Sequence, residues 1–300
     1  MKLLMTGGTG FIGQALVKRW LKSNHQLTVL TRRPGQWTDY WNNQVVCISQ
    51  FDQLEQAADF DVVINLAGEP IVDKRWTGER KRQLRASRID LTEHLINFLK
   101  QLATPPKALL NASAIGFYGY HRADKSIDEN CPAADDFAAT LCKDWEQTAK
   151  TAEPLGIRVC LMRFGVVLGQ GGGALQKMLL PFRLGLGGRI STGEQTMSWV
   201  YLEDLLNAID FLINHDELSG PFNITSPNPV SNAQFSKALA DQLKRPAIFP
   251  VPAFMLKLML SEAADLLLKG QRVVPDRLVK AGFEFQFAEL QATLAAILPR

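Results

Sequence analysis

The stretch TGGTGFIG, residues 6–13, constrains the fold of this chain more than any other feature. It places Gly7, Gly10 and Gly13 directly between an apolar run and a helical pattern over residues 11–22. In such a turn, the first glycine permits the tight bend, the second lets the backbone approach a pyrophosphate, and the third lets the helix pack against the strand. The free N–H groups at the helix start attract phosphate. We therefore predict a dinucleotide-binding turn, with a purely structural glycine turn as the alternative.

The first two-thirds of the chain alternates short apolar runs with helical patterns. Continuous apolar strands that alternate with helices indicate a parallel sheet covered on both faces. The expected strands cover residues 2–6, 26–31, 44–49, 60–68, 107–114 and 157–167, and the expected helices cover residues 11–22, 77–102 and 136–151. The pattern predicts an α/β fold, a Rossmann-type doubly wound parallel sheet.

The alternation of strands and helices stops after Val167, where a glycine-rich, irregular stretch begins. Farther on, Ser231 is a predicted N-cap of a helix. The Met-rich run PVPAFMLKLMLSEAADLLLKG predicts a pair of helices packed in a core. We expect a Rossmann domain at residues 1–168, to which some later segments return, and a smaller C-terminal α+β lobe at residues 169–300. Such a lobe would close over the carboxyl edge of the sheet, where ligands bind.

Composition excludes several classes of protein. The formal net charge of +3 is small for 300 residues, and the basic residues are interleaved with acids, so nucleic-acid binding is not expected. No apolar run reaches the ~18–20 residues that span a bilayer, and the N-terminus lacks a signal peptide. The four cysteines form no CxxC pair and have no histidine at metal-ligand spacing, so we expect free thiols and no metal site. These features predict a cytoplasmic protein without a membrane partner.

The end of the second strand predicts which dinucleotide is bound. An NAD site has Asp or Glu about 20 residues after the glycines, where it accepts from the ribose 2′-OH. Here the strand ends with Thr31, Arg32 and Arg33. An arginine forms charge-assisted bonds with a 2′-phosphate, which a carboxylate would repel. NADP(H) is therefore favoured over NAD(H), unless these arginines belong to a solvated loop.

Small residues at the end of the fourth strand would let the backbone lie against the same ligand. They belong to the segment NLAG, and are Leu66, Ala67 and Gly68. Phe51 and Asp52, which follow the third strand, are candidates to border the adenine, although both would also suit an ordinary loop.

TGxxGxxG, NLAG, the serine of NASAIGFYG and a later lysine resemble the extended short-chain dehydrogenase/reductase superfamily. Longer stretches, among them GEPIVDKRWT and LLLKGQRVVPDRLVKAGFEF, are similar to a narrower branch of NAD-dependent epimerase/dehydratase relatives with a C-terminal domain of unknown function. The resemblance covers essentially the whole chain. The cofactor contacts that it implies are Gly7, Gly8, Thr9, Gly10, Phe11, Ile12, Gly13, Thr31, Arg32, Leu66, Ala67, Gln83, Arg88 and Val167. Arg88 would otherwise be a surface arginine of a helix.

The superfamily's catalytic tyrosine and lysine lie four residues apart on one helix, near a serine that polarises the substrate oxygen. The resemblance places the serine at Ser113 and the lysine at Lys143, but Ala139 stands at the position of the tyrosine. Proton transfer by such a group is worth about 10²- to 10⁴-fold in rate. Tyr118 is the first candidate for a substitute acid, with a wall of the pocket as its alternative role.

Other carboxylates and aromatic residues remain as candidates. Asp128, Glu129 and Glu69 would serve as acids if burial raised their pKa values. The predicted substrate-pocket residues are Arg75, Trp76, Arg183, Gln195, Trp199 and Tyr201. Arginines there would favour an anionic substrate. Alternatively, these side chains hold the two lobes together.

Two functions follow. The first is an NADP(H)-binding oxidoreductase or epimerase-like protein that acts on a small or sugar-like carbonyl or alcohol. The second is a non-catalytic NADP(H)-binding sensor or regulatory protein. The sequence leaves open the substrate and the choice between a monomer and a homodimer.

Overall fold

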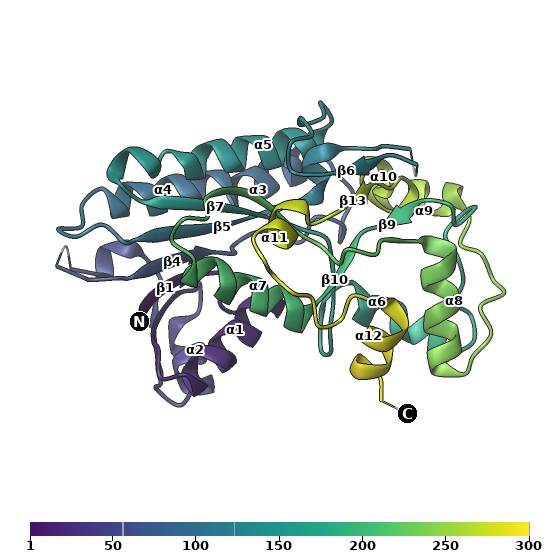
Figure 1. Cartoon of the computed structure of the whole chain (residues 1–300), viewed down its shortest axis with the longest axis horizontal. Helices are drawn as coiled ribbons and strands as arrows, with labels where there is room; N and C mark the ends of the chain where they lie inside the picture. Colours follow the sequence, from purple (N-terminus) through teal and green to yellow (C-terminus); the bar gives the residue numbers. More distant parts are fainter. Residues whose placement is uncertain (56, 123, 300) are drawn as a thin grey trace.

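The computed structural model describes residues 1–55, 57–122 and 124–299. Its centre is a seven-stranded sheet in which all neighbouring strands are parallel (Figure 1). In spatial order, the strands are β11 (Gly220–Ile224), β7 (Arg158–Phe164), β5 (Ala108–Ala114), β4 (Val62–Asn65), β1 (Lys2–Thr6), β2 (Gln26–Leu30) and β3 (Val45–Ile48). The order reverses between β1 and β4, so the predicted doubly wound Rossmann-type sheet is confirmed.

The strands are continuous apolar runs because both faces of the sheet are covered. All four residues of β4 are buried. The expected sixth strand, residues 157–167, is divided at Gly165 into β7 and β8 (Val166–Leu168). A Cβ on Gly165 would lie 2.7 Å from the Ser198 carbonyl oxygen, so only glycine permits this close approach. β8 leaves the large sheet and pairs with β10 (Trp199–Tyr201).

Helices cover both faces of the sheet (Figure 1). One face carries α1 (Phe11–Lys22), α2 (Pro34–Tyr40) and α7 (Leu202–Asn214), and the other carries α4 (Ile89–Leu99) and α5 (Phe137–Lys150). The indole of Trp20 donates to the Asp210 carboxylate at 2.7 Å, which joins α1 to α7. Two elements beyond residue 169 thus return to the larger domain: β11 is a strand of the seven-stranded sheet, and α7 packs against that sheet.

The helix expected over residues 77–102 is two helices, so this expectation is wrong. α3 (Gly78–Ala86) begins at Thr77, whose side chain accepts from the Arg80 amide, and α4 begins after Arg88. The break lies at Ser87 and Arg88. There the Arg88 side chain turns back and donates to the carbonyl of Glu69 at 2.9 Å.

The smaller lobe packs around a separate apolar cluster. Its elements and the short pairings at its border are α6 (Gly173–Arg183), β9 (Thr196–Met197), β12 (Val230–Ser231), α8 (Asn232–Leu243), α9 (Ala253–Leu260), α10 (Asp265–Leu268), α12 (Leu290–Ile297), β6 (Ser126–Ile127), β13 (Arg272–Val273) and α11 (Asp276–Lys280). The predicted Ser231 cap is confirmed: its hydroxyl accepts from the Gln234 amide, and the Gln234 side chain accepts in return.

The Met-rich run forms only part of the expected core: Ala263 and Ala264, which follow its first helix, are buried, but that helix, α9, is not. None of the residues of α9, all of them described, is buried, and Phe254, Leu258 and Met259 are 70%, 73% and 65% exposed. The run is apolar on every side, so its periodicity does not distinguish a packed face from an open one.

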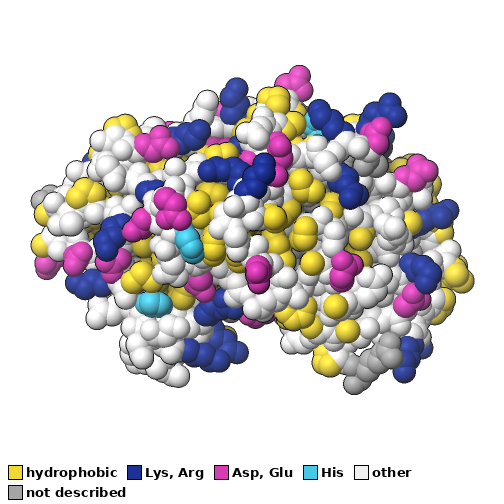
Figure 2. Space-filling model, viewed as in Figure 1, with side chains coloured by type: hydrophobic (Ala, Val, Ile, Leu, Met, Phe, Trp, Pro, Cys, Tyr) yellow, Lys and Arg dark blue, Asp and Glu magenta, His cyan; other side chains and the backbone are white. Residues whose placement is uncertain are grey.

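The molecular surface carries both signs of charge. Figure 2 shows Lys and Arg side chains interspersed with Asp and Glu over the face in view. Among the helices of the described residues, none is long and apolar enough to cross a membrane.

Candidate functional site

The glycine turn brings the end of β1 to the start of α1 with no room for side chains. Gly7 has a φ of +71°, and a Cβ there would lie 2.6 Å from the Leu66 carbonyl carbon. A Cβ on Gly13 would lie 2.2 Å from the Gly7 carbonyl oxygen. In the described chain no side chain caps α1, and its first turn has no acidic residue. The first amides of α1 are therefore open to an anion.

The end of β2 presents an arginine to solvent. Thr31 is buried, and its hydroxyl accepts from the Arg33 amide at 3.4 Å. The Arg32 side chain is 91% exposed, and its ion pair with Glu69 is long, at 3.4 Å. An ion pair this exposed contributes little, so the Arg32 guanidinium is available to a ligand.

The end of β4 lies against the glycine turn. The Ala67 amide donates to the Thr6 hydroxyl at 3.3 Å, and this hydroxyl donates to the buried Asn65. Asn65 donates in turn to Thr92 at 2.8 Å. This buried network ties the ends of β1 and β4 to α4, and it sets Leu66 and Ala67 beside Gly7.

The three remaining cofactor candidates, Arg88, Gln83 and Val167, lie in three different environments. Arg88 is half-buried beside Gly68: a Cβ on that glycine would lie 3.0 Å from the guanidinium carbon. Gln83 is exposed and bonds to Arg80 and Glu79, so it points along α3. The Val167 carbonyl faces Gly173, where an added Cβ would approach it to 3.0 Å.

A cavity of about 420 Å³ opens between the ends of β2 and β3 and α4. Its lining includes Phe51, Asp52 and His94. The Phe51 ring stacks on Phe98 with centroids 5.3 Å apart, which fixes one wall of the cavity. The cavity adjoins Leu30, one residue before Thr31, and is therefore next to the arginine at the end of β2.

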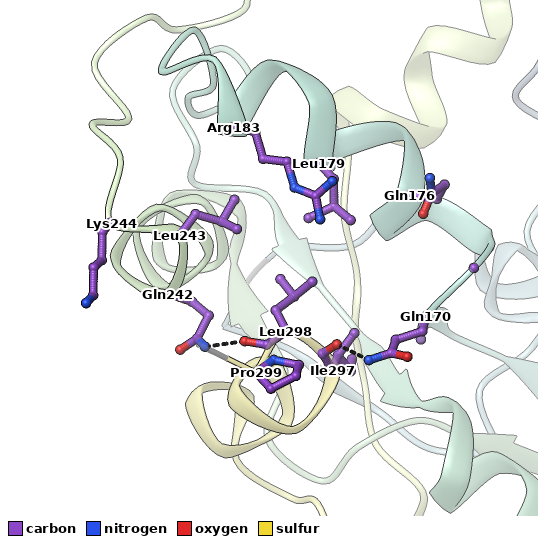
Figure 3. A pocket seen from close by; sticks show the side chains of 12 residues that line it. Gln170, Gln176, Leu179, Arg183, Gln242, Leu243, Lys244, Ile297, Leu298 and Pro299 are labelled. Atoms are coloured by element: carbon purple, nitrogen blue, oxygen red, sulfur yellow. Dashed lines mark hydrogen bonds between the residues drawn. The ribbon is translucent and has the colours of Figure 1, made fainter.

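A larger cavity, of about 510 Å³, lies in the smaller lobe (Figure 3). Gln170 donates to the Ile297 carbonyl and Gln242 to the Leu298 carbonyl, both at 2.6 Å, so these amides bind the C-terminal segment. Of the predicted substrate residues, Arg183 alone lines this cavity. The cavity therefore does not unite the predicted substrate pocket.

Ser113 and Tyr118 belong to one buried polar network. The Ser113 hydroxyl donates to Glu146, which also accepts from Arg163 at 2.8 Å. The Tyr118 hydroxyl accepts from Arg163 at 2.8 Å and donates to Asn223 at 2.7 Å. Tyr118 is 0% exposed, and burial raises its pKa to about 12. The structure thus does not present Tyr118 to a substrate as an acid.

Lys143 does not reach this network. It is exposed, whereas its neighbour Cys142 is buried. Successive helix residues point about 100° apart, so only one of the two side chains can face β5. Ala139, in the tyrosine's place, is 0% exposed. The structure does not assemble Ser113, Lys143 and Tyr118 into one catalytic set.

The predicted acids and pocket aromatics mostly have structural contacts. Glu129 is buried and accepts from the amides of Asn223 and Arg277, and burial raises its pKa. Glu69 pairs with Arg32 and Arg80. Asp128 accepts from the Asn130 amide of its own turn.

The substrate-pocket candidates are also divided. Trp76 and Trp199 are buried and donate to the carbonyls of Ile71 and Asn228. Gln195 donates to two backbone carbonyls, and Tyr201 packs edge-on against Phe287. Arg75 is exposed.

The sequence interpretation missed Glu146, Arg163 and Asn223. Arg163 had a signal, because it is a charged residue inside an otherwise apolar strand, and such a residue requires a buried partner. Burial alone would lower the pKa of Arg163, but the bonds and charge of Glu146 outweigh it and raise that pKa.

Comparisons with known proteins point to one family. The profile of the NAD dependent epimerase/dehydratase family matches residues 3–225, and that of a domain of unknown function (DUF1731) matches residues 251–297. The epimerase family protein YfhF of Bacillus subtilis is 36% identical over 299 residues, which cover 99% of this chain and 98% of that protein. An epimerase family protein of Mycobacterium leprae is 40% identical over 284 residues, 94% of this chain and 90% of that protein.

Two solved structures extend the comparison. The human epimerase family protein SDR39U1, crystallised with NADPH, is 32% identical, with a TM-score of 0.89 and 99% of each chain covered. UDP-glucuronic acid 4-epimerase from Bacillus cereus has a TM-score of 0.78 over 99% of this chain and 98% of its own, but at 16% identity it shares the fold alone.

Proposed function

Because the chain belongs to the NAD dependent epimerase/dehydratase family, in the branch with a C-terminal domain of unknown function, we propose that it binds NADP(H) at the carboxyl edge of its sheet. We infer that it acts as an oxidoreductase or epimerase-like protein on an unidentified small or sugar-like carbonyl or alcohol. The family membership confirms the resemblance that the motifs indicated.

The observation that carries this proposal is the turn at residues 7–13. The required glycines, the open amides of α1 and the end of β4 lie together at the point where the strand order reverses. This is where doubly wound folds bind the pyrophosphate of a dinucleotide. The NADPH in the human relative, similar over the whole chain, supports the same ligand here.

Preference for NADP(H) is supported by Arg32. Its exposed guanidinium stands at the end of β2 beside the cavity that Phe51 and Asp52 line. The adenine would occupy this cavity, and the 2′-phosphate would meet Arg32. The remaining proposed contacts are the backbone of Leu66, Ala67, Gly68 and Val167, with Gln83 at the periphery.

A bound NADP(H) supplies hydride exchange. The chain's own contribution is to hold the dinucleotide and to exclude water beneath the smaller lobe. Ser113 is buried near the end of β5. Its hydroxyl is committed to Glu146, so any substrate oxygen would have to compete with that carboxylate.

A specific observation favours the second candidate, a non-catalytic NADP(H)-binding sensor or regulatory protein. Ala139 has no proton to donate, Lys143 is exposed, and Tyr118 is enclosed by Arg163 and Asn223. Among the described residues, these side chains supply no proton donor at the position of the superfamily's tyrosine.

Calorimetry of the cofactor-free protein tests the binding proposal. We expect heat with NADPH and weaker binding of NADH, and we expect Arg32→Asp to remove the preference, because a carboxylate repels the 2′-phosphate. Absence of binding by either dinucleotide would overturn the proposal. Following NADPH absorbance with a panel of carbonyl compounds then separates the two candidates, since a sensor binds NADPH without oxidising it.

A further inference from the structure

Most of the exposed large apolar side chains in the described residues lie on two segments, residues 180–186 and 248–259. Six of them, each between 51% and 73% exposed, define what we call the α9 surface: Leu184, Leu186, Phe249, Phe254, Leu258 and Met259. A soluble protein rarely exposes a contiguous apolar patch of this kind unless a ligand or a partner covers it.

The two segments lie side by side. The Val251 amide donates to the Arg189 carbonyl at 2.8 Å, and Gly188 approaches Phe249 so closely that an added Cβ would collide with its carbonyl oxygen. α9 begins two residues after Val251, so its apolar side chains extend the region that these contacts hold together. The α9 surface is therefore one region of the smaller lobe.

The charge around this surface has mainly one sign. Residues 180–191 and 244–260 contain no Asp or Glu, and their exposed cations are Arg183, Arg189, Lys244, Arg245 and Lys257. Two of the acids that border these segments, Asp241 and Glu262, pair with lysines outside them, which leaves Glu194. The surface is therefore complementary to an anion. A second copy related by a two-fold axis would face it with the same cations, and like charges in contact disfavour such a dimer.

The end of α9 joins the surface to the carboxyl edge of the sheet. Leu260, the last residue of α9, packs against a buried cluster that includes Trp76, Ala112 and Ala138. Ala112 directly precedes Ser113 in β5, and Ala138 lies in the first turn of α5. An apolar chain laid along α9 would thus lead to the edge at which NADP(H) is proposed to bind. A bilayer that touches α9 from outside would gain nothing from this continuity.

We propose that the α9 surface binds the apolar chain of an anionic amphiphile, and that the substrate is an alcohol or carbonyl carried on such a chain. The inference rests on the proposed NADP(H)-dependent function and deepens it, because it narrows the substrate class. In the reductive direction, NADPH gives a hydride to the carbonyl carbon and becomes NADP⁺. The π electrons of the carbonyl move to its oxygen, which takes a proton from water to form the alcohol.

The first test measures binding by calorimetry on the whole chain with NADPH present. The probes are dodecanoate below its aggregation concentration, hexanoate and dodecyltrimethylammonium. The variants are Phe254→Ser, Leu258→Ser and Lys257→Gln. The control, Val279→Ser, removes a 52% exposed apolar side chain of α11. All four side chains are exposed, so the variants should fold. If a thermal melt shows one serine variant of α9 to be unfolded, the other decides.

We expect dodecanoate to bind saturably and about 10- to 100-fold more tightly than hexanoate, since six more methylenes lie against the surface on one side. The cationic amphiphile should bind at least about tenfold more weakly than dodecanoate. Each serine variant of α9 should weaken dodecanoate by about three- to tenfold, and Lys257→Gln by about two- to fivefold, the worth of an exposed ion pair. Val279→Ser should match the wild type, and NADPH affinity should be equal in all five proteins.

The second test measures turnover by following NADPH absorbance with 12-oxododecanoate and 6-oxohexanoate. The longer aldehyde should have a KM lower by about tenfold or more, with a similar kcat, because the chain adds binding and not chemistry. Leu258→Ser should raise the KM of the longer aldehyde alone. Equal KM values for the two aldehydes, or no oxidation of NADPH by either, would overturn the substrate class.

The binding test separates this inference from the proposed function. NADPH binding without dodecanoate binding, or dodecanoate binding that both serine variants of α9 retain in full, would overturn the inference and leave the function intact. Binding to vesicles of anionic lipid but not to monomeric dodecanoate would assign the surface to a bilayer instead. A dimer in sedimentation that Leu258→Ser dissociates would assign it to a second copy, and either result overturns the inference. If the wild type binds no dinucleotide, the proposed function itself fails.

Discussion

The hydroxyl of Ser113 donates to the carboxylate of Glu146 at 2.7 Å, and both residues are buried. Glu146 is itself clamped by two bonds from Arg163. The serine that the family resemblance marks as catalytic is thus part of an ion-pair network between β5, β7 and α5. Its hydrogen bond stabilises the fold whether or not the protein is an enzyme.

Ser113→Ala should therefore act mainly on stability. The substitution removes the hydrogen bond that the Glu146 carboxylate accepts from the serine hydroxyl. Because that carboxylate is buried, we expect the free energy of unfolding to fall by about 1–3 kcal/mol. Affinity for NADPH should stay unchanged. Chemical denaturation and calorimetry measure the two quantities. A variant as stable as the wild type but with at least tenfold slower turnover of an identified substrate would instead support a catalytic serine.

Lys143→Ala should change almost nothing. The side chain is exposed, and exposed substitutions away from caps and ion pairs alter stability by roughly 0.5 kcal/mol or less. Neither NADPH affinity nor the melting temperature should respond. Glu146→Ala, one turn farther along α5, provides the contrast, because it leaves Arg163 as an unpaired buried charge and should cost about 3–5 kcal/mol. A marked loss of NADPH binding in Lys143→Ala would contradict the orientation of α5 described above.

Tyr118→Phe removes a hydroxyl that serves both Arg163 and Asn223, so we expect the free energy of unfolding to fall by about 1–3 kcal/mol near neutral pH. The pH dependence is diagnostic. Burial raises the pKa of Tyr118 from 10.0 to about 12, so the folded state keeps its proton while the unfolded chain ionises. That contribution is complete below about pH 10 and is lost as the pH rises through about 12.

The difference in stability between wild type and Tyr118→Phe should therefore shrink between about pH 10 and pH 12. Denaturant titrations of both proteins across this range measure it. A difference that stays constant would show that Tyr118 ionises in the folded protein as readily as in the unfolded one. An activity that Tyr118→Phe abolishes without loss of stability would restore this residue as the acid.

The backbone of the glycine turn and of the sheet was predictable because its sequence signals are local. Gly13 is required by a contact within its own turn, and Gly7 by its φ of +71°. Alternating apolar runs indicate a parallel sheet without reference to any partner. The Ser231 cap is likewise a short-range pattern. Each of these features depends on residues a few positions apart.

The catalytic region was less predictable because its contacts are long-range. Whether Lys143 or Cys142 faces β5 depends on the rotation of α5, which packing against the sheet decides and spacing alone does not. The partners of Arg163 come from α5, from the 3-10 turn that holds Tyr118 and, through Asn223, from β11. The prediction that α9 is buried failed for a different reason. A helix that is apolar all round predicts burial whichever face it turns to a core, so its sequence does not show whether any face is packed.

Gly13→Ala should abolish dinucleotide binding. The added methyl would lie 2.2 Å from the Gly7 carbonyl oxygen, so α1 would have to move away from the turn that presents its amides. Gly35→Ala is a matched control, because nothing lies within 4 Å of its Cβ position and it is in the first turn of α2. The control should gain up to about 1 kcal/mol of stability and keep NADPH binding. Equal NADPH affinity in Gly13→Ala would remove the glycine turn from the binding site.

The cysteines provide a test of the sheet–helix packing that needs no substitution. Burial raises the pKa values of Cys142 and Cys160 to about 11, so at pH 8 roughly one thiol in a thousand at these sites is ionised. Cys47 and Cys131 are only partly buried.

Iodoacetamide should therefore label Cys131 and Cys47 first in the native protein and all four cysteines after denaturation, as peptide mass spectrometry would show. Because the thiolate is the reactive form, a higher pH should speed labelling at every site. Cys142 and Cys160, which are buried, should stay slower than Cys47 and Cys131. Rapid native labelling of Cys142 would mean that α5 presents this face to solvent, and that Lys143, one position on, is the side chain turned toward Ser113.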